Sequence, residues 1–453
     1  MSRSTMKDMT VGSPIRLILG FAVPLFFGML FQQFYSLMDT VIVGQFLGAR
    51  ALAAVGTTGS INFMIIGFCM GVCNGFAIPM AQRFGAKDEK MLRCFVANSV
   101  WLAIIFASVM TVVVSLLCRN ILMWMNTPSD IIDEAYQYIF IIFIGIPATY
   151  LYNLLSGIIR SLGDSKSPLI FLVISSVLNI ILDVVAILGF RMGVAGAAWA
   201  TVLSQAISGV LCLFYMRKKF PILKISKEEW KIRGNCIGRL CSMGIPMGLQ
   251  YSITAIGSVI LQTAVNGLGS VVVASMTAGG KISMFFCCPF DAFGSTMATY
   301  AGQNVGACKL DRVTKGMVQC SFLAAAYSVL AAVVLIGFGD KLALLFVDSG
   351  EIEIIKNVEE VLMWNSLFYI PLALVNIIRF SIQGLGFGKL AIFAGVAEMV
   401  GRSIVGFGFV SVFGFTAACL ASPIAWILAD LFLVPAYRYC MRKLKRMMNF
   451  AET

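Results

Sequence analysis

The sequence predicts an all-α integral membrane protein with twelve transmembrane helices, arranged in two six-helix lobes that are related by a parallel internal repeat. Three observations predict this fold class. The first is composition, because 59% of the 453 residues are hydrophobic and only 12% are charged. A water-soluble chain cannot cover that much apolar surface with polar residues. The second is a series of long apolar segments, and the third is a one-sided distribution of Lys and Arg.

The apolar segments are long enough to be transmembrane helices, since a helix needs about 20 mainly apolar residues to cross a bilayer. The first of them follows a short polar stretch in which no cleavable signal peptide is recognised. Several exceed the minimum length, so tilted or protruding helices are expected. The twelve predicted spans are 15–44, 51–80, 94–118, 132–159, 168–189, 194–216, 237–265, 271–301, 317–338, 354–383, 389–411 and 415–437.

The basic residues predict the orientation of these spans. With the N-terminus inside, 26 of the 34 Lys and Arg residues fall in cytoplasmic segments and five in outer loops. This bias predicts a multi-pass protein of the inner (plasma) membrane with both termini in the cytoplasm. It also accounts for the net charge of +12 without a nucleic-acid partner. The three remaining basic residues, Lys281, Arg379 and Arg402, fall inside predicted spans.

The two halves of the chain resemble each other at an offset of 221–224 residues. "GFAVP" pairs with "SMGIP", so that Pro24 matches Pro246, and "IGIPATYLYNLL" pairs with "FYIPLALVNII". Because six spans is an even number, both halves have the same orientation, which defines a parallel repeat. The expected parts are an N-terminal lobe over 1–216, a cytoplasmic linker over 217–236, and a C-terminal lobe with a basic cytoplasmic tail over 237–453.

Two aspartates of the first half lie in predicted spans without a basic residue nearby in their own helices. An aspartate near the middle of a membrane helix costs about 2.5–3.5 kcal/mol on insertion scales, so a functional role is expected for Asp39 and Asp183. Tyr35 and Asn179 each precede one of them by four residues and therefore share its helix face. Further oxygen atoms from neighbouring helices are expected from Asn153 and Thr201. These groups suit a coupling proton or a hard cation, with Na⁺ a candidate ligand of Asp39, Asn179, Asp183 and Thr201.

The structural alternative for the uncharged members is that they form helix-packing hydrogen bonds. In the second half, a polar cluster of Lys281, Glu398 and Arg402 is considered. Glu398 and Arg402 are four residues apart and are expected to pair, while Lys281 is a candidate partner of Glu398 or Asp291. Charge neutralisation is favoured here over substrate contact, because opposite charges offset the insertion cost. The chain has no His and 13 scattered Cys, so neither a structural metal nor a disulfide is expected.

These residues resemble the multidrug and toxic compound extrusion (MATE) transporters, within the multidrug/oligosaccharidyl-lipid/polysaccharide exporter superfamily. The resemblance covers essentially the whole chain and is carried by "AVPLFFGMLFQQFYSLMDTVIVGQFLGARALAAVG", "MAQRFGAKD", "RSLGDSKSP" and "NIILDVVAI". It implies a two-lobe exporter of bulky, often cationic xenobiotics that is driven by inward H⁺ or Na⁺. No other cofactor is expected, and a monomer in the lipid bilayer is expected.

The resemblance is strongest to the branch of the DNA-damage-inducible F proteins, which carries a cation pocket in the N-lobe. The positions that match this pocket are Tyr35, Asp39, Asn153, Asn179, Asp183 and Thr201, and Pro24 matches the bend of the first helix. The NorM-like branch places a glutamate where this chain has Thr254 and an aspartate near Asn376. The absence of these acids argues against ion coupling in the second lobe.

Other functions remain as alternatives at this stage. A lipid-linked saccharide flippase of the same superfamily would use a basic groove, for which Lys281, Arg379 and Arg402 are candidates. A membrane-embedded enzyme is disfavoured, since the chain lacks His, paired acidic motifs and a nucleotide-binding loop. A channel is disfavoured because no repeated selectivity filter is present. The sequence therefore predicts a secondary active multidrug efflux antiporter and not an enzyme, with the substrate and the choice between H⁺ and Na⁺ left open.

Overall fold

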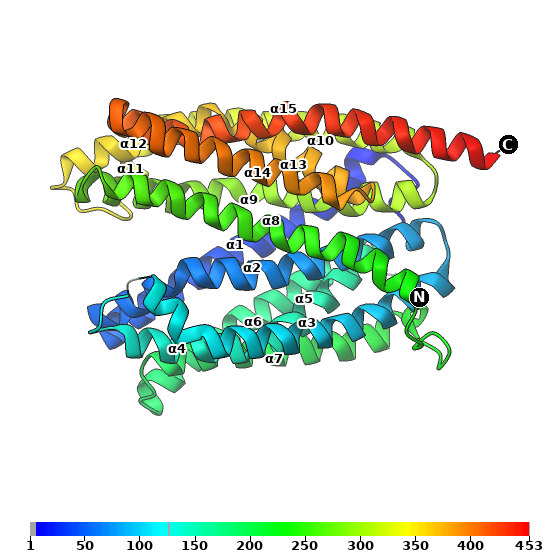
Figure 1. Cartoon of the computed structure of the whole chain (residues 1–453), viewed down its shortest axis with the longest axis horizontal. Coiled ribbons are helices and arrows are strands. Elements are labelled where there is room, and N and C mark those ends of the chain that lie inside the picture. The colour runs from blue at the N-terminus through cyan, green and yellow to red at the C-terminus, as the bar shows by residue number, and fades with distance from the viewer. Residues whose placement is uncertain (1–5, 126, 453) are drawn as a thin grey trace. The chain divides into compact units, whose positions relative to one another are not determined.

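Every regular element is a helix in the computed structural model, which describes residues 6–125 and 127–452 (Figure 1). The elements are α1 (Pro14–Leu47), α2 (Ala49–Gly85), α3 (Glu89–Trp124), α4 (Ile132–Ile144), α5 (Ile146–Ser161), α6 (Lys166–Val184), η1 (Val185–Gly189), α7 (Val194–Lys219), η2 (Pro221–Leu223), α8 (Gly234–Asn266), α9 (Ser270–Gly306), α10 (Leu310–Gly337), α11 (Gly339–Ala343), α12 (Ile352–Leu367), α13 (Tyr369–Gly384), α14 (Gly388–Ser403), η3 (Ile404–Phe409) and α15 (Val410–Glu452).

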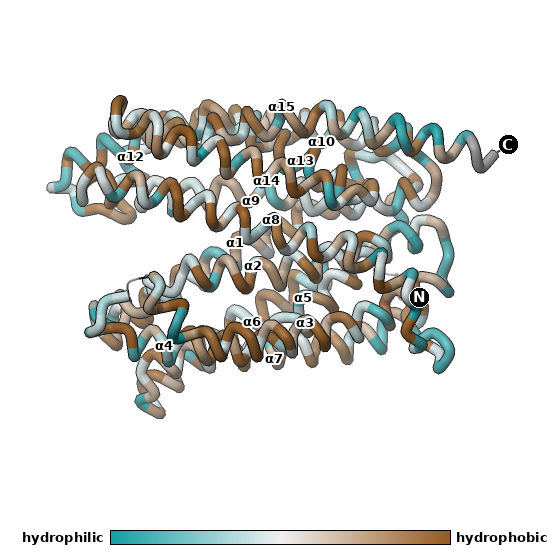
Figure 2. Tube along the Cα trace, viewed as in Figure 1, coloured by the Kyte–Doolittle hydropathy of each residue, from teal (hydrophilic) through white to brown (hydrophobic). Residues whose placement is uncertain are grey.

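The predicted number of spans follows from the lengths of these helices. Nine helices of the described chain are long and apolar enough to cross a membrane, and two bent pairs, α4 with α5 and α12 with α13, bring the number to eleven. One of the nine, Gly388–Asn449, has 62 residues, about 93 Å of helix against a hydrocarbon core of about 30 Å. It is broken at Gly414, where φ is 58°. Counting it as two spans gives the predicted twelve. Apolar residues run along the helices and polar ones gather at loops and near the end of α15 (Figure 2).

The internal repeat is visible in the backbone as well as in the sequence. Gly48 and Gly269 precede α2 and α9 with φ of 87° and 101°, and Lys87 and Cys308 follow these helices with φ of 57° and 58°. The bent pairs repeat in the same way, with angles of 45° and 50°. A π-helical turn follows both α6 and α14. Irregular conformations that recur in the same order, at offsets of 219–223 residues, indicate two copies of a single architecture.

The chain forms two compact units that exchange the first halves of two helices. The first unit contains Phe27–Leu249 and the described residues before Met9, and the second contains Met9–Phe26 and the residues from Gln250 onward. The division therefore falls inside α1 and α8 rather than at the linker. In each helix it lies a few residues after a proline, Pro24 in α1 and Pro246 in α8. Proline removes one backbone hydrogen bond, so each helix changes unit near its weakest turn.

The start of α6 explains one of the sequence motifs. Gly163 has φ of 82°, and a Cβ there would lie 2.0 Å from the Lys7 carbonyl oxygen, so that only glycine fits. Asp164 follows and accepts hydrogen bonds at 3.0 Å from the backbone N–H groups of Lys166 and Ser167. This satisfies donors at the first turn of the helix. "RSLGDSKSP" therefore fixes where α6 begins, and with it the position of the acidic residue at its far end.

Candidate cation-binding site

Asp39 and Asp183 meet within the first unit. Asp39 lies on α1, and Asp183 is the second-to-last residue of α6, which the π-helical turn η1 follows. Asp183 is fully buried, Asp39 is half-buried, and the two side chains interact with each other. Single π-helical turns occur often at functional sites. The helix geometry thus joins two carboxylates that are 144 positions apart in the chain.

Two tyrosines surround the pair. Tyr35 of α1 interacts with both carboxyl groups, as expected from its position one turn before Asp39. Tyr138 of α4 also interacts with both, and only 6% of its surface is exposed. The sequence did not indicate Tyr138. Its only signal was a phenolic hydroxyl inside a predicted span, which without the packing of α4 against its neighbours does not identify a site.

The predicted amide and hydroxyl ligands divide into two groups. The Nδ2 of Asn179 donates to the Oγ1 of Thr201 at 3.3 Å, which links α6 to α7 beside Asp183. The Nδ2 of Asn153 instead donates to the carbonyl of Thr149 at 2.8 Å, within α5. The Thr149 hydroxyl in turn donates to Gln205 of α7 at 2.8 Å. Asn179 and Thr201 are therefore joined near the carboxylates, whereas the amide nitrogen of Asn153 is engaged within its own helix.

Four oxygen atoms of this cluster are buried without a hydrogen-bond partner in the described chain. They are the Oδ1 of Asp39, both carboxyl oxygens of Asp183 and the Oδ1 of Asn179. Neither carboxylate has a basic side chain among its interacting groups in the described residues. Buried acceptors without a donor are destabilising, and a proton or a bound cation relieves this cost.

This set of oxygen atoms fits the coupling ions that the sequence suggested. Carboxylate, amide and hydroxyl oxygens are ligands for hard cations, and a carboxylate pair also holds a proton. Within the described residues, no group of three or more His, Cys, Asp or Glu side chains is placed to hold a metal ion. The chemistry of the donor atoms therefore favours H⁺ or Na⁺ over a transition metal.

The second unit buries charges that neutralise one another. Glu398 of α14 forms an ion pair with Arg379 of α13 at 2.8 Å and with Arg402 of its own helix at 3.6 Å, and all three side chains are at most 9% exposed. The expected pairing of Glu398 with Arg402 is present, and Arg379 is an additional and closer partner. Arg379 also donates to the Oδ1 of Asn376 at 3.0 Å. Lys281 is exposed and forms no ion pair with the described residues.

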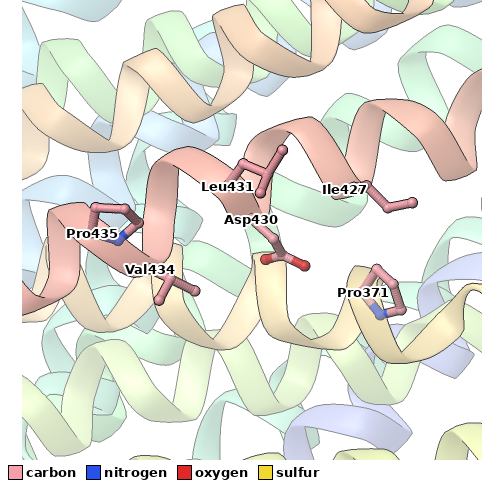
Figure 3. A pocket seen from close by; sticks show the side chains of 6 residues that line it. All are labelled: Pro371, Ile427, Asp430, Leu431, Val434 and Pro435. Atoms are coloured by element: carbon pink, nitrogen blue, oxygen red, sulfur yellow. The ribbon is translucent and has the colours of Figure 1, made fainter.

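Two further acids lie near this ion-pair cluster. Asp430 of α15 points toward α13 in Figure 3, where it lines a cavity of about 420 Å³ together with Pro371. Asp430 and Asp291 of α9 both interact electrostatically with Arg379. Three acids of the second unit, Glu398, Asp430 and Asp291, therefore interact with one guanidinium group, in contrast to the acidic pair of the first unit.

A repeated bundle of membrane-spanning helices with a buried acidic site defines a polytopic membrane transporter. The MatE family model matches residues 24–185 and 246–408, once in each repeat. The chain belongs to the MATE family, as the resemblance predicted.

Similar proteins include a probable multidrug resistance protein and a solved transporter. The chain is 31% identical over 82% of its length, and 82% of the other chain, to the probable multidrug resistance protein YpnP of Bacillus subtilis (strain 168). It is 26% identical over 63% of its length to the DNA damage-inducible protein F of Escherichia coli (strain K12), 62% of which is covered. A solved outward-facing structure of a multidrug resistance MATE family transporter shares the fold, with a TM-score of 0.90, 21% identity and coverage of 97% and 98%. The protein is thus a membrane transporter and not an enzyme.

Proposed function

We propose that this protein exports bulky, often cationic small molecules across the inner membrane by antiport with H⁺ or Na⁺. The observation that carries the proposal is the contact of Asp39 with Asp183 in the absence of a basic partner. Two adjacent carboxylates in a low-dielectric environment cannot both stay charged unless a cation lies with them. The names of the relatives, which include multidrug resistance proteins, support the substrate class.

The residues of the pair and its neighbours have separable roles in this proposal. Asp39 and Asp183 hold the coupling ion. Asn179 and Thr201, already hydrogen-bonded to each other, orient the amide oxygen of Asn179 toward the site. For Na⁺, these four side chains supply the ligands. For H⁺, the proton lies on the carboxylate pair, and the hydroxyls of Tyr35 and Tyr138 donate to whichever oxygen remains charged.

The orientation in the membrane follows the distribution of basic residues. Both termini and the segment between α7 and α8 lie in the cytoplasm, because Lys and Arg concentrate there. A flippase for lipid-linked saccharides gains no support from the second unit. Arg379 and Arg402 are both paired with Glu398, so they do not form the free basic groove that such a substrate requires.

The test is dye export in inside-out membrane vesicles, with a ΔpH or a ΔNa⁺ imposed separately. The wild-type protein should export dye in response to one of the two gradients. Asp39→Asn and Asp183→Asn should fold and insert but lose this response. Asp430→Asn, which changes a buried carboxylate of the second unit, should retain it. Export by Asp39→Asn at the wild-type rate under the same gradient would remove the basis of the proposal.

A further inference from the structure

The first unit contains a cavity with a volume of about 950 Å³. It is separate from the acidic pair. It lies between α3, α5, α7 and the segment that follows α7, and most of its wall is aliphatic, including Val100, Ala103, Leu154 and Leu213. Its size is that of a small-molecule binding pocket. None of the groups assigned to ion coupling lines it, so the proposed antiport leaves its purpose unexplained.

The length of the cavity is close to the thickness of one leaflet of a bilayer. Its lining runs along α3 from Val96 to Ser108, a rise of about 18 Å at 1.5 Å per residue. Half of a hydrocarbon core is about 15 Å thick. The lining residue Ile104 is 53% exposed, and the nearby surface residue Phe214 on α7 is 63% exposed. The cavity therefore opens on an apolar surface of the kind that faces lipid.

The end of the cavity near the linker is basic. Arg217 in the last turn of α7 and Lys224 just after η2 both line it and are both exposed. The lining residues in the described chain include no acid, and neither cation forms an ion pair there. Trp230 lies at the same end, and Trp is enriched where a protein crosses the membrane interface. We call this end, with Arg217 and Lys224, the mouth of the cavity. An apolar cavity with a cationic mouth is complementary to an amphiphile that has an anionic head group.

The mouth is held in place by contacts between the linker and α3. The Nε of Arg93 donates to Glu229 at 2.8 Å, and the indole N–H of Trp101 donates to the carbonyl of Trp230 at 3.2 Å. Farther along, the Oδ1 of Asn98 accepts from the backbone N–H of Arg233 at 2.9 Å. Three side chains from successive turns of one helix thus position the linker, so the basic groups are presented by a fixed element.

We propose that this cavity binds an anionic phospholipid of the cytoplasmic leaflet. Its phosphate contacts Arg217 and Lys224, and one acyl chain lies along α3 between α5 and α7. Basic pockets between membrane helices on the cytoplasmic side are suited to anionic head groups. The assignment uses the proposed membrane orientation but does not depend on the coupling chemistry at Asp39.

The head-group contact is tested by native mass spectrometry of the purified full-length protein. The probes are phosphatidylglycerol, phosphatidylcholine with the same acyl chains, and inorganic phosphate. Phosphatidylglycerol should bind most tightly, and inorganic phosphate should neither bind nor compete. Arg217→Gln/Lys224→Gln should weaken phosphatidylglycerol binding roughly thirtyfold, since each surface cation contributes about fivefold. Lys227→Gln, a linker cation outside the cavity, should change it less than twofold.

The acyl-chain contact is tested by filling the cavity. Ala103→Leu, inside the cavity, should weaken binding of phosphatidylglycerol at least fivefold, whereas Val109→Leu, on the exposed surface of the same helix, should not. If the double variant is not monodisperse, Lys224→Gln alone should give about a fivefold loss. Equal binding of the two lipids, competition by phosphate, or unchanged binding by Lys224→Gln and Ala103→Leu would each overturn the proposal. Asp39→Asn should bind the lipid like wild type, which separates this test from that of ion coupling.

Discussion

Buried charge is treated in two different ways by the residues of this chain. Asp39 and Asp183 face each other with unpartnered oxygens, whereas Glu398 is held between Arg379 and Arg402. Both arrangements must offset the cost of charge in a membrane. The ion-pair cluster does so permanently with protein groups. The acidic pair has no such protein partner among the described residues, and in the proposed function a bound cation from outside offsets this cost.

If the two aspartates hold one ion together, their substitutions should not be additive. We expect Asp39→Asn and Asp183→Asn each to lower gradient-driven export to a similar small residual rate, and the double variant to export no more slowly than either single one. The measurement is the initial rate of dye export in inside-out vesicles at matched protein levels. Losses that multiply in the double variant would indicate two independent sites.

Removing the acid of the ion-pair cluster should affect stability rather than coupling. Glu398→Gln removes the ion-pair partner that two buried guanidinium groups share, and breaking a buried pair in this way costs about 3–5 kcal/mol. We expect a clearly lower Tm in detergent and an unchanged preference for ΔpH or ΔNa⁺ in the remaining activity. Glu360→Gln is the control, because the hydrogen-bond donors to Glu360 in the described part of the chain, Thr416 and Trp364, are uncharged. If Glu398→Gln had a normal Tm but lost its dependence on ΔpH or ΔNa⁺, the coupling site would lie in the second unit instead.

Sequence reasoning found the contacts that a single helix determines. Tyr35 with Asp39, and Glu398 with Arg402, were predicted because residues four apart share a helix face. Tyr138 and Arg379 were not assigned to their partners, because these contacts join different helices. Which helix faces meet depends on how the helices pack, and residue spacing in a single sequence does not predict that packing.

At the scale of elements, the prolines of α1 and α8 lie beside the points where the chain passes from one unit to the other. Pro24→Ala should restore a backbone hydrogen bond to Gly20 and favour a straight α1. We expect export to fall several-fold while the Tm stays equal or rises. Pro423→Ala, in α15, provides the control for replacing a proline inside a helix. Unchanged export by Pro24→Ala would show that Pro24 is not required for transport.

The linker contact with α3 gives a prediction about pH. Burial acts to raise the pKa of Glu229, but hydrogen bonds from the Ser226 backbone and from Arg93 outweigh it and hold that pKa below its usual value. The lowered pKa means that this contact stabilises the linker fully above the ordinary glutamate pKa of about 4.3. The stabilisation is lost as pH falls through the lowered value.

Hydrogen exchange of residues 224–233, corrected for intrinsic rates, should therefore show protection that decreases below about pH 4. Glu229→Gln should lose part of this protection already at neutral pH. Glu228→Gln, at the exposed neighbouring position, should behave like wild type. Equal protection in all three proteins at neutral pH would show that Arg93 and Glu229 do not hold the linker.

Element boundaries were predicted well, and the break near Gly414 falls between two predicted spans, but hydropathy did not show the breaks inside two other spans. The first predicted span, 15–44, compares with Pro14–Leu47 for α1. The spans 132–159 and 354–383 are each broken into two helices, at Gly145 and Phe368. Hydropathy is the same on both sides of a bend, so a hydropathy pattern shows one continuous span and not the break. The prolines near the starts of α5 and α13 were the available signal.

At the scale of the whole molecule, the fold repeats but the chemistry does not. Each half has a bent span and a π-helical turn, but the described residues of the first half hold the acidic pair without a basic partner, whereas the acids Glu398, Asp430 and Asp291 of the second half interact with Arg379. A cation can drive a conformational change only if it binds one state more tightly, and a shift from 1:99 to 99:1 requires about a 10⁴-fold difference in affinity. A single asymmetric site can supply this difference.

The membrane orientation can be tested with a thiol that the protein already has. Of the 13 free cysteines in the described chain, Cys308 alone is exposed, in the turn between α9 and α10. The predicted topology puts this turn in the cytoplasm. An impermeant maleimide should therefore label Cys308 in inside-out vesicles and not in intact cells. In a Cys308→Ser background, Asp348→Cys, between α11 and α12, should give the opposite pattern. Labelling of Cys308 in intact cells would invert the topology, and would place Arg217 and Lys224 at the outer leaflet instead.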